Sequence, residues 1–211
     1  MSMKLILFSP SDKKESELPF LLNMFELGLQ TYHIRKMKYS TGQIKRFIES
    51  IPEKYHSRLV IHTHHELAMK YKLKGVYITR SHRKRKYRTW LRMLWFKIRK
   101  KELQLSMTIR SIEDLLDYKS KYKYVLLAPV FDSLSGNYQS AFSERDLRTS
   151  LAQTKYKVIA RGGIALDKIE KAHDMGFAGI ALYSGIWKTQ NPLEEFKQVK
   201  EKFKELKIPM E

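Results

Sequence analysis

The sequence has 211 residues, of which 43% are apolar and 30% charged, so it describes a folded globular chain and excludes a disordered one. It has no cysteine, which excludes disulfide bonds, thiolate catalysis and zinc–thiolate sites. Its 41 Lys and Arg against 22 Asp and Glu give a net charge of +19, which favours an anionic partner: a phosphorylated small molecule, nucleic acid or acidic lipid.

The N-terminal residues, MSMKLILFSPSD, contain too short an apolar run for a signal peptide. No other run approaches the roughly 18 apolar residues of a membrane-spanning helix. We therefore expect no transmembrane segment and a cytoplasmic protein.

Short apolar runs rich in Val, Ile, Leu or Tyr alternate along the chain with longer amphipathic stretches. In chain order, the runs predicted as strands are 4–8, 31–35, 58–62, 75–79, 103–107, 124–128, 157–161 and 179–183. The stretches with helical spacing are 15–29, 40–50, 65–73, 83–101, 109–120, 144–153, 166–175 and 192–206. This alternation predicts an α/β fold, a (β/α)8 TIM barrel with a single domain over residues 1–211. The alternative is a doubly wound open sheet, which usually has fewer strands and a phosphate loop after the first one.

Two adjacent glycines, Gly162 and Gly163, separate the predicted seventh strand from the next helix. Glycine accepts a positive φ and lets the backbone approach a ligand, and N–H groups at the start of a helix suit phosphate. The predicted eighth strand similarly ends in Tyr183, Ser184 and Gly185. Since (β/α)8 barrels often bind phosphate after strands 7 and 8, we interpret these loops as a phosphate site. The alternative is that each glycine only relieves crowding.

Six motifs, in barrel order, resemble those of the thiamine-phosphate synthase and thiazole tautomerase family, a family of (β/α)8 barrels. YHIRK (32–36) resembles its Gln-x-Arg, LVIHTHHELAMKYKLKGVYIT (59–79) its Ile-Asn-Asp and Gly-Val-His-Leu, and LSMT (105–108) its Ser-x-His. The remaining three, similar to its motifs at strands 6, 7 and 8, are YVLLAPVFDSLS (124–135), VIARGGI (158–164) and GIALYSGI (179–186). The resemblance covers nearly the whole chain.

This resemblance implies a transferase of thiamine biosynthesis or salvage, which joins a pyrimidine methyl diphosphate to a thiazole phosphate and releases diphosphate. Gly162, Gly163, Tyr183 and Ser184 would hold the thiazole phosphate. The other residues expected to bind substrate are His33, Arg35 and Lys36 on the diphosphate side, His62 at the family's asparagine, Ser106 at its serine, and Ser133 and Ser135 at its threonines. The resemblance assigns no catalytic residue.

The sequence departs from the family at the magnesium ligands. Thr63 stands at the aspartate of the third strand, and residues 79–81 lack the second acid. Met37 and Gly136 stand at two family lysines, and Pro129 at the histidine of the tautomerase branch. Magnesium prefers carboxylates, so we expect it to reach the site only through a substrate diphosphate, and ordinary synthase activity to be low. The basic residues that could neutralise a diphosphate instead are Arg35, Lys36, Arg80 and Arg161.

The histidines of HTHH (62–65), followed by Glu66, invite a metal interpretation. We favour a polar strand-to-helix loop, because adjacent helical residues face different directions. We expect His82 and His173 at the surface.

Residues 80–101 contain eleven Lys and Arg and no acid. The apolar residues there at helical spacing are Tyr87, Trp90, Leu91, Leu94, Trp95 and Ile98. We predict the fourth barrel helix, with this stripe packed on the sheet. The alternatives for the whole protein are a thiazole tautomerase-like barrel, or a non-catalytic barrel whose basic face binds nucleic acid, an acidic membrane or another polyanion. No helix-turn-helix or RNA-binding signature accompanies the segment, which disfavours nucleic acid.

Overall fold

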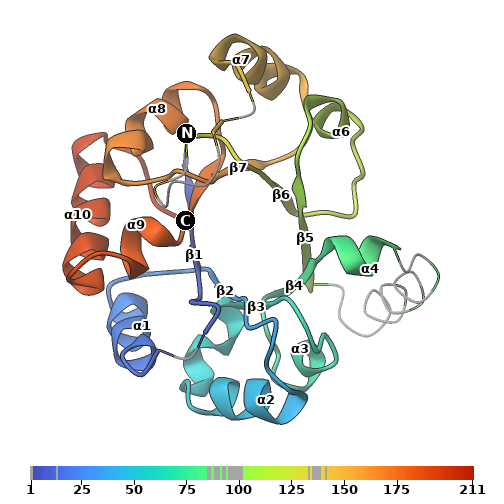
Figure 1. Ribbon diagram of the computed structural model, residues 1–211, viewed down its shortest axis with the longest axis vertical. Coiled ribbons are helices and arrows are strands. Elements are labelled where there is room, and N and C mark those ends of the chain that lie inside the picture. The colour runs from blue at the N-terminus through green and yellow to red at the C-terminus, as the bar shows by residue number, and fades with distance from the viewer. Residues whose placement is uncertain are drawn as a thin grey trace.

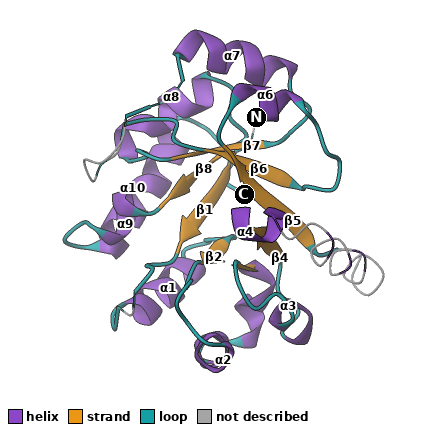
Figure 2. Cartoon of the chain, turned by 45° about the vertical axis from the view of Figure 1, so that its right-hand side comes forward, coloured by secondary structure: helices purple, strands orange, loops and turns teal. Residues whose placement is uncertain are grey.

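The computed structural model describes residues 2–12, 14–84, 87, 91, 94, 102–132, 134, 139–140 and 142–211. Its centre is a closed barrel of eight parallel strands, in which each strand pairs with its neighbours in the chain and β8 pairs with β1 (Figure 1). The helices lie around the outside of this barrel (Figure 2). The predicted (β/α)8 barrel is confirmed, and the open sheet is excluded.

In the parts of the chain that the structure describes, no helix combines the length and the apolar character needed to cross a membrane.

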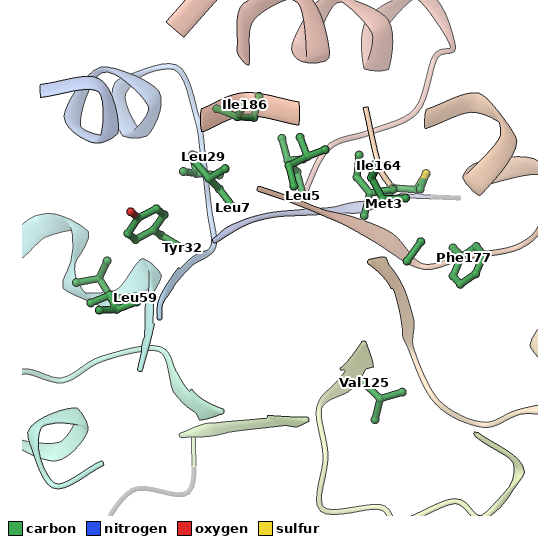
Figure 3. Close-up of a cluster of buried hydrophobic side chains, with 14 of the residues drawn as sticks. Met3, Leu5, Leu7, Leu29, Tyr32, Leu59, Val125, Ile164, Phe177 and Ile186 are labelled. Atoms are coloured by element: carbon green, nitrogen blue, oxygen red, sulfur yellow. The ribbon is translucent and has the colours of Figure 1, made fainter. Parts of the chain in front are cut away.

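Each strand is buried on both faces, which explains the continuous apolar runs in the sequence. In β1, Leu5 and Leu7 point outward into the core beneath the helices, whereas Ile6 and Phe8 point into the barrel. Figure 3 shows part of the outer core. The strands are β1 (Lys4–Phe8), β2 (Tyr32–Ile34), β3 (Leu59–Ile61), β4 (Gly75–Ile78), β5 (Gln104–Ile109), β6 (Tyr124–Leu127), β7 (Val158–Arg161) and β8 (Gly179–Leu182).

Side-chain caps begin several helices. Ser40 and Gln43 form a capping box, and Ser143 and Asn191 accept hydrogen bonds from the first turns of their helices. The helices are α1 (Glu17–Glu26), α2 (Thr41–Glu49), α3 (Leu67–Lys70), α4 (Arg80–Lys84), α6 (Ile112–Leu116), α7 (Glu144–Gln153), α8 (Ile169–Asp174), α9 (Ser184–Trp187) and α10 (Pro192–Glu205), with 3-10 turns η1 (Glu53–Arg58) and η2 (Leu166–Lys168).

The structure differs from the prediction mainly at short elements. β5 extends to Ile109, and the next helix begins only at Ile112 because the Ser111 side chain caps it by accepting from the Asp114 N–H. Two elements, η1 and α9, were not predicted. Both directly precede or follow a strand, where a single turn leaves no periodic pattern to detect.

The predicted packing of the basic helix is wrong for its described apolar residues. Tyr87, Leu91 and Leu94 are 71%, 43% and 42% exposed instead of packed on the sheet. The other predicted members of the stripe, Trp90, Trp95 and Ile98, lie outside the described residues.

Closure of the barrel depends on a close approach between its first and last strands. Lys4 to Leu7 pair in register with Gly179 to Leu182. A Cβ atom on Gly179 would lie 2.3 Å from the carbonyl oxygen of Lys4, so a side chain there would separate the two strands. The glycine at the start of β8 is therefore required by strand pairing.

A buried ion pair joins α1 to the end of β2. The Lys36 ammonium donates to the Glu17 carboxylate, and Tyr32 donates to the same carboxylate at 2.7 Å. Lys36 also donates to the carbonyl oxygen of Asp12 at 3.1 Å. Only 1% of the Lys36 side chain is exposed. These contacts use the ammonium within the fold, so Lys36 anchors α1.

We expect Lys36→Met to lower the free energy of unfolding by about 3–5 kcal/mol, because it leaves the Glu17 carboxylate buried without its counterion. Adding Glu17→Gln should restore much of this loss, since the amide is neutral and still accepts from Tyr32. Urea unfolding of the two variants measures the effect. A loss of less than about 1 kcal/mol in Lys36→Met is the size expected for an exposed ion pair. It would contradict the anchoring role and would support substrate binding by Lys36 instead.

Candidate active site

The carboxyl ends of the strands meet at one rim, and a polar, aromatic layer lies directly below it inside the barrel. His33 on β2 contacts rings from four other strands or strand ends, with centroid distances of 4.7 Å to Phe8, 5.2 Å to His62, and 6.0 Å to both Tyr77 and Tyr124. Side chains from strands so far apart in sequence meet only in the barrel interior. The interior is therefore a filled floor below the rim, as expected for an eight-stranded barrel.

Two histidines in this floor are joined by hydrogen bonds. His33 Nδ1 lies 3.0 Å from His62 Nε2, and His33 Nε2 lies 2.6 Å from the Tyr124 hydroxyl. Burial, reinforced by the positive charge of Arg161, holds the pKa of His33 well below its ordinary value. Burial also lowers the pKa of His62, with His33, Arg161 and Arg35 adding to the effect. Both imidazoles are therefore neutral at physiological pH, and each offers one donor and one acceptor.

Tyr77 completes the floor. Its ring stacks on His62 with 4.0 Å between centroids and 12° between planes. Its hydroxyl donates at 2.7 Å to Thr108 Oγ1, which also lies 3.5 Å from an Arg161 Nη1. The Arg161 guanidinium carbon lies 4.7 Å from the centre of the Phe8 ring. Arg161, half-buried at the end of β7, thus brings a positive charge to the upper side of a neutral aromatic layer.

The two glycines after β7 have a steric role. Gly162 and Gly163 have φ values of 93° and 67°, which favour glycine. A Cβ atom on Gly163 would lie 2.2 Å from the carbonyl oxygen of Asp132. The loop after β6 reaches this turn, where Val130 N–H donates to Arg161 O at 3.0 Å and Phe131 N–H to Gly162 O at 3.1 Å. The turn interpretation is therefore supported, and a substitution at Gly163 would disturb the fold whatever the site binds.

The loop after β8 lies against the same turn. A Cβ atom on Gly185 would lie 2.7 Å from the carbonyl oxygen of Ile164, so the two loops touch. Trp187, at the end of α9, donates from Nε1 to the carbonyl oxygen of Phe8 at 2.7 Å, which fixes α9 over β1. Tyr183 and Ser184 are half-buried at this junction.

The structure brings most of the predicted site residues to one end of the barrel. His33 and His62 touch, and buried Ser106 pairs in register with Tyr77 on one side and Tyr124 on the other. Arg35 follows β2 and is half-buried, its N–H donating to Ser9 Oγ at 2.7 Å. The adjoining loops after β7 and β8 contain Gly162, Gly163, Tyr183 and Ser184. The Lys36 side chain turns toward α1. Ser133 and Ser135 lie outside the described residues.

Sequence reasoning missed Tyr77, Thr108 and Tyr124, which hold the histidine pair in place. A signal was available, because side chains alternate along a strand, and Tyr77 and Tyr124 fall on the inward positions. The phase of that alternation could not be fixed without the barrel. These tyrosines belong to an inner core that also contains Ile6, Phe8, Val60, Leu126, Ile159 and Ala181.

His65 and His82, expected in a polar loop and at the surface, instead pack together. Their ring centroids are 4.4 Å apart. His65 Nε2 lies 3.2 Å from His62 O and 3.1 Å from Tyr77 O, and His82 Nδ1 lies 2.9 Å from Thr79 Oγ1. These contacts tie the β3 and β4 ends together. Across the described residues, no group of three or more His, Asp or Glu side chains is arranged to hold a metal ion.

A sequence model of the family described as thiamine monophosphate synthase matches residues 5–186. Among solved structures, the thiamine phosphate pyrophosphorylase of Bacteroides thetaiotaomicron has a TM-score of 0.73 at 23% identity, covering 97% of this chain and 98% of that one. The thiamine phosphate pyrophosphorylase of Pyrococcus furiosus has a TM-score of 0.74 at 16% identity, covering 97% and 96%. A search of curated protein sequences finds no match.

The same barrel also resembles (S)-3-O-geranylgeranylglyceryl phosphate synthase of Thermoplasma acidophilum, with a TM-score of 0.67 at 14% identity and coverage of 97% of this chain and 94% of that one. At these identities, structural likeness shows the fold alone. The family match is more specific, since it runs from the first strand through most of α9. The chain belongs to the thiamine monophosphate synthase family.

Proposed function

We propose that this protein binds a phosphorylated thiazole or pyrimidine of thiamine biosynthesis or salvage at the C-terminal rim of the barrel. Family membership supports this class of ligand. The observation that carries the proposal is the position of Arg161, which lies beside the glycine turn and over a floor of neutral aromatic side chains. A heterocycle with an attached phosphate needs this pair of features, a flat polar surface and an adjacent positive charge.

Arg161 is the proposed phosphate ligand. A guanidinium binds phosphate oxygens through two parallel N–H donors, and its stacking on Phe8 limits the freedom lost on binding. Arg35, at the neighbouring end of β2, adds positive potential, and its charge already contributes to lowering the pKa of His62. Ser184 and the N–H groups of the β7 and β8 loops would complete the phosphate site.

The histidine pair would face the heterocycle. By the resemblance, His33 and His62 stand where the family has Gln and Asn. A neutral imidazole offers one donor and one acceptor, so it can replace an amide that reads the edge of a polar ring. A protonated imidazole would lose its acceptor and repel Arg161. The low pKa values of both histidines therefore support a role in binding an uncharged ring edge.

Magnesium does not fit the residues present. Thr63 and Thr79 stand at or beside the family's acidic positions, and neither provides a carboxylate. Thr63 Oγ1 is buried without a hydrogen-bond partner among the described residues, and Thr79 Oγ1 is engaged by Ser81 and His82. We assign no step to a metal held by the protein. Departure of a diphosphate needs its developing charge neutralised, so we propose low ordinary synthase turnover.

The proposed binding of phosphate by Arg161 can be tested by ligand-induced stabilisation. Thiazole phosphate at about 100 times its Kd, in the presence of EDTA, should stabilise the wild-type protein by about 2.7 kcal/mol. We expect Arg161→Gln to weaken binding by about tenfold or more, because it removes a charge-assisted contact. Arg145→Gln, which makes the same charge change on the exposed surface of α7, should bind normally. Wild-type affinity in Arg161→Gln would reject this site.

The missing metal ligand can be restored. Magnesium binds free diphosphate in solution, and this alone changes the apparent affinity of the protein for diphosphate. In wild type, we expect magnesium to cause no change beyond that. Thr63→Asp should make diphosphate binding magnesium-dependent, because it adds a carboxylate at the buried, unsatisfied position of Thr63. Thr63→Asn provides a neutral control of the same shape. Calorimetric titration with and without magnesium measures both, and an equal response in the two variants would refute the assignment.

The buried histidines predict a pH dependence of stability. Their folded pKa values lie below the unfolded value of about 6.5, so their contribution is complete above that pH and is lost as the pH falls. We expect the free energy of unfolding to fall by about 1.4 kcal/mol per pH unit below 6.5 for each histidine kept neutral. The double variant His33→Gln with His62→Asn, whose amides do not titrate, should show a shallower slope. Identical slopes in wild type and the double variant would contradict the conclusion that His33 and His62 are buried in the neutral form.

A further inference from the structure

The amino ends of the strands meet at the end of the barrel opposite the candidate site, and lysines gather there. Lys4 begins β1, and Lys123 and Lys157 directly precede β6 and β7. In the closed barrel, β7 pairs with β6 on one side and with β8 on the other, and β8 pairs with β1. The three lysines therefore belong to neighbouring strand ends around one mouth of the barrel.

Two of these lysines lie on the inner face of their strands. Side chains alternate along a strand, and Ile6 on β1 and Ile159 on β7 belong to the inner core. Lys4 and Lys157 each lie two residues before these isoleucines, so both face the interior of the barrel at its amino end. Lys4 is half-buried, whereas Lys157 is exposed at the mouth. A charged pair thus occupies inward positions that an apolar core would fill with isoleucine or valine.

A buried amide without a partner lies on the same inner face. Gln104 begins β5, two residues before Ser106, which pairs in register with the inner-core residues Tyr77 and Tyr124. Gln104 Oε1 is buried and has no hydrogen-bond partner in the part of the chain that the structure describes. Buried polar groups are ordinarily paired. Rotation of the amide would let its NH2 group donate to an anion at this mouth.

The positive charges of this mouth are not neutralised within the described residues. No ion pair there involves Lys4, Lys123 or Lys157. Burial lowers the pKa of Lys4, and although Glu211 opposes this change, Lys157 and Lys123 add to it. The Glu211 carboxylate itself accepts from the Ser2 hydroxyl. A bound anion would relieve the repulsion among the lysines.

A fourth lysine at this end adds charge but is used by the fold. Lys74 directly precedes β4, and its ammonium donates to the carbonyl oxygen of Gln30 at 2.7 Å and to Thr31 Oγ1 at 2.8 Å. Burial lowers its pKa to about 8, with Lys4 and Arg58 adding to the effect. Lys74 therefore contributes positive potential and is not among the ligands that we assign.

We propose that the amino end of the barrel binds a compact polyanion of the phosphate class, held by Lys4, Lys123, Lys157 and the Gln104 amide. Lysine binds phosphate as a point charge, and a diphosphate or triphosphate brings several negative charges into one small space. An extended polyanion would lie across the outer surface and would not need the inward positions of Lys4 and Gln104. This inference does not rest on the proposed function, because it uses the opposite end of the barrel.

The test is calorimetric titration of the full-length protein with inorganic triphosphate in EDTA, in an Arg161→Gln background that weakens the proposed rim site. We expect one triphosphate to bind, more weakly as salt rises. Adding Lys4→Gln with Lys157→Gln should reduce the affinity by about tenfold or more, because it removes two charged hydrogen-bond donors. Lys45→Gln with Lys197→Gln, which removes the same charge from the exposed surfaces of α2 and α10, should bind normally.

Folding of the variants is checked by their melting temperatures. Lys4 is half-buried, so a second pair, Lys123→Gln with Lys157→Gln, removes two exposed lysines and tests the same site if the first pair does not fold. We expect this second pair to weaken triphosphate binding by about tenfold as well.

Amide resonances provide a readout of position. In the Arg161→Gln protein, triphosphate should shift the amide signals of Lys4 and Gly179, which pair at the amino end, and leave those of Gly162 and Gly163 at the rim unchanged. Failure to bind triphosphate at low salt, equal affinity in the lysine variants and the control, or shifts at the rim alone would each overturn the proposal. Binding of an oligonucleotide or polyglutamate without binding of triphosphate would also overturn it, since the partner would then be an extended one.

Discussion

The pairing of β8 with β1 is the interaction on which the rest of the structure depends. It converts a sheet into a closed barrel, and it forces the inward side chains of all strands into one enclosed space. The contacts of His33 on β2 with Tyr77 on β4 and Tyr124 on β6 depend on this closure, since these strands are not neighbours in the sheet and meet only across the enclosed interior. Closure also brings the ends of the strands to a common rim, where the candidate site lies.

The second constraint is electrostatic. A chain with a net charge of +19 must place cations where they do not destabilise the fold, and two solutions are visible near the rim. Lys36 is neutralised within the fold by Glu17, so its charge does not reach the mouth of the barrel. Arg161 instead lies against Phe8 beside histidines that burial keeps neutral. Because His33 and His62 are neutral, Arg161 has no second positive charge directly below it in the barrel. This arrangement is compatible with binding of an anion.

We propose that the threonines at the positions where the resemblance expects acidic ligands belong to the same electrostatic pattern. Thr63 and Thr79 carry no charge, so they add no carboxylate after β3 and β4. Glycine is required after β7 because a Cβ atom on Gly163 would collide with the backbone of the loop after β6. This requirement is compatible with a phosphate site, because the glycine turn directly follows Arg161 in the chain.

Much of the fold was predictable from the sequence. The apolar runs located all eight strands, and the motif at 158–164 located the glycine turn, because burial on both faces and a positive φ leave direct marks on residue type. The partners of the histidine pair were not predictable. Tyr77 and Tyr124 look like ordinary strand residues until barrel closure fixes which side faces inward. The ion pair of Lys36 with Glu17 was not predictable either, because Glu17 lies on another element and shares no local pattern with Lys36.

The exposed stripe of residues 87, 91 and 94 was also unpredictable, for a different reason. Helical spacing of apolar residues is the same whether the stripe packs on a sheet or faces a partner outside the chain. Only the tertiary structure distinguishes the two, by the exposed fraction of those side chains.

The most direct measurement of the central claim is a ³¹P NMR experiment on the wild-type protein with thiazole phosphate. In EDTA, we expect the phosphorus resonance to shift on binding, because arginine and backbone N–H groups hold the phosphate without metal. Addition of the pyrimidine diphosphate and magnesium should then produce little or no thiamine phosphate. A resonance unchanged in EDTA, or rapid formation of thiamine phosphate that requires magnesium, would contradict the account and would mean that the protein holds the metal through groups not identified at this rim.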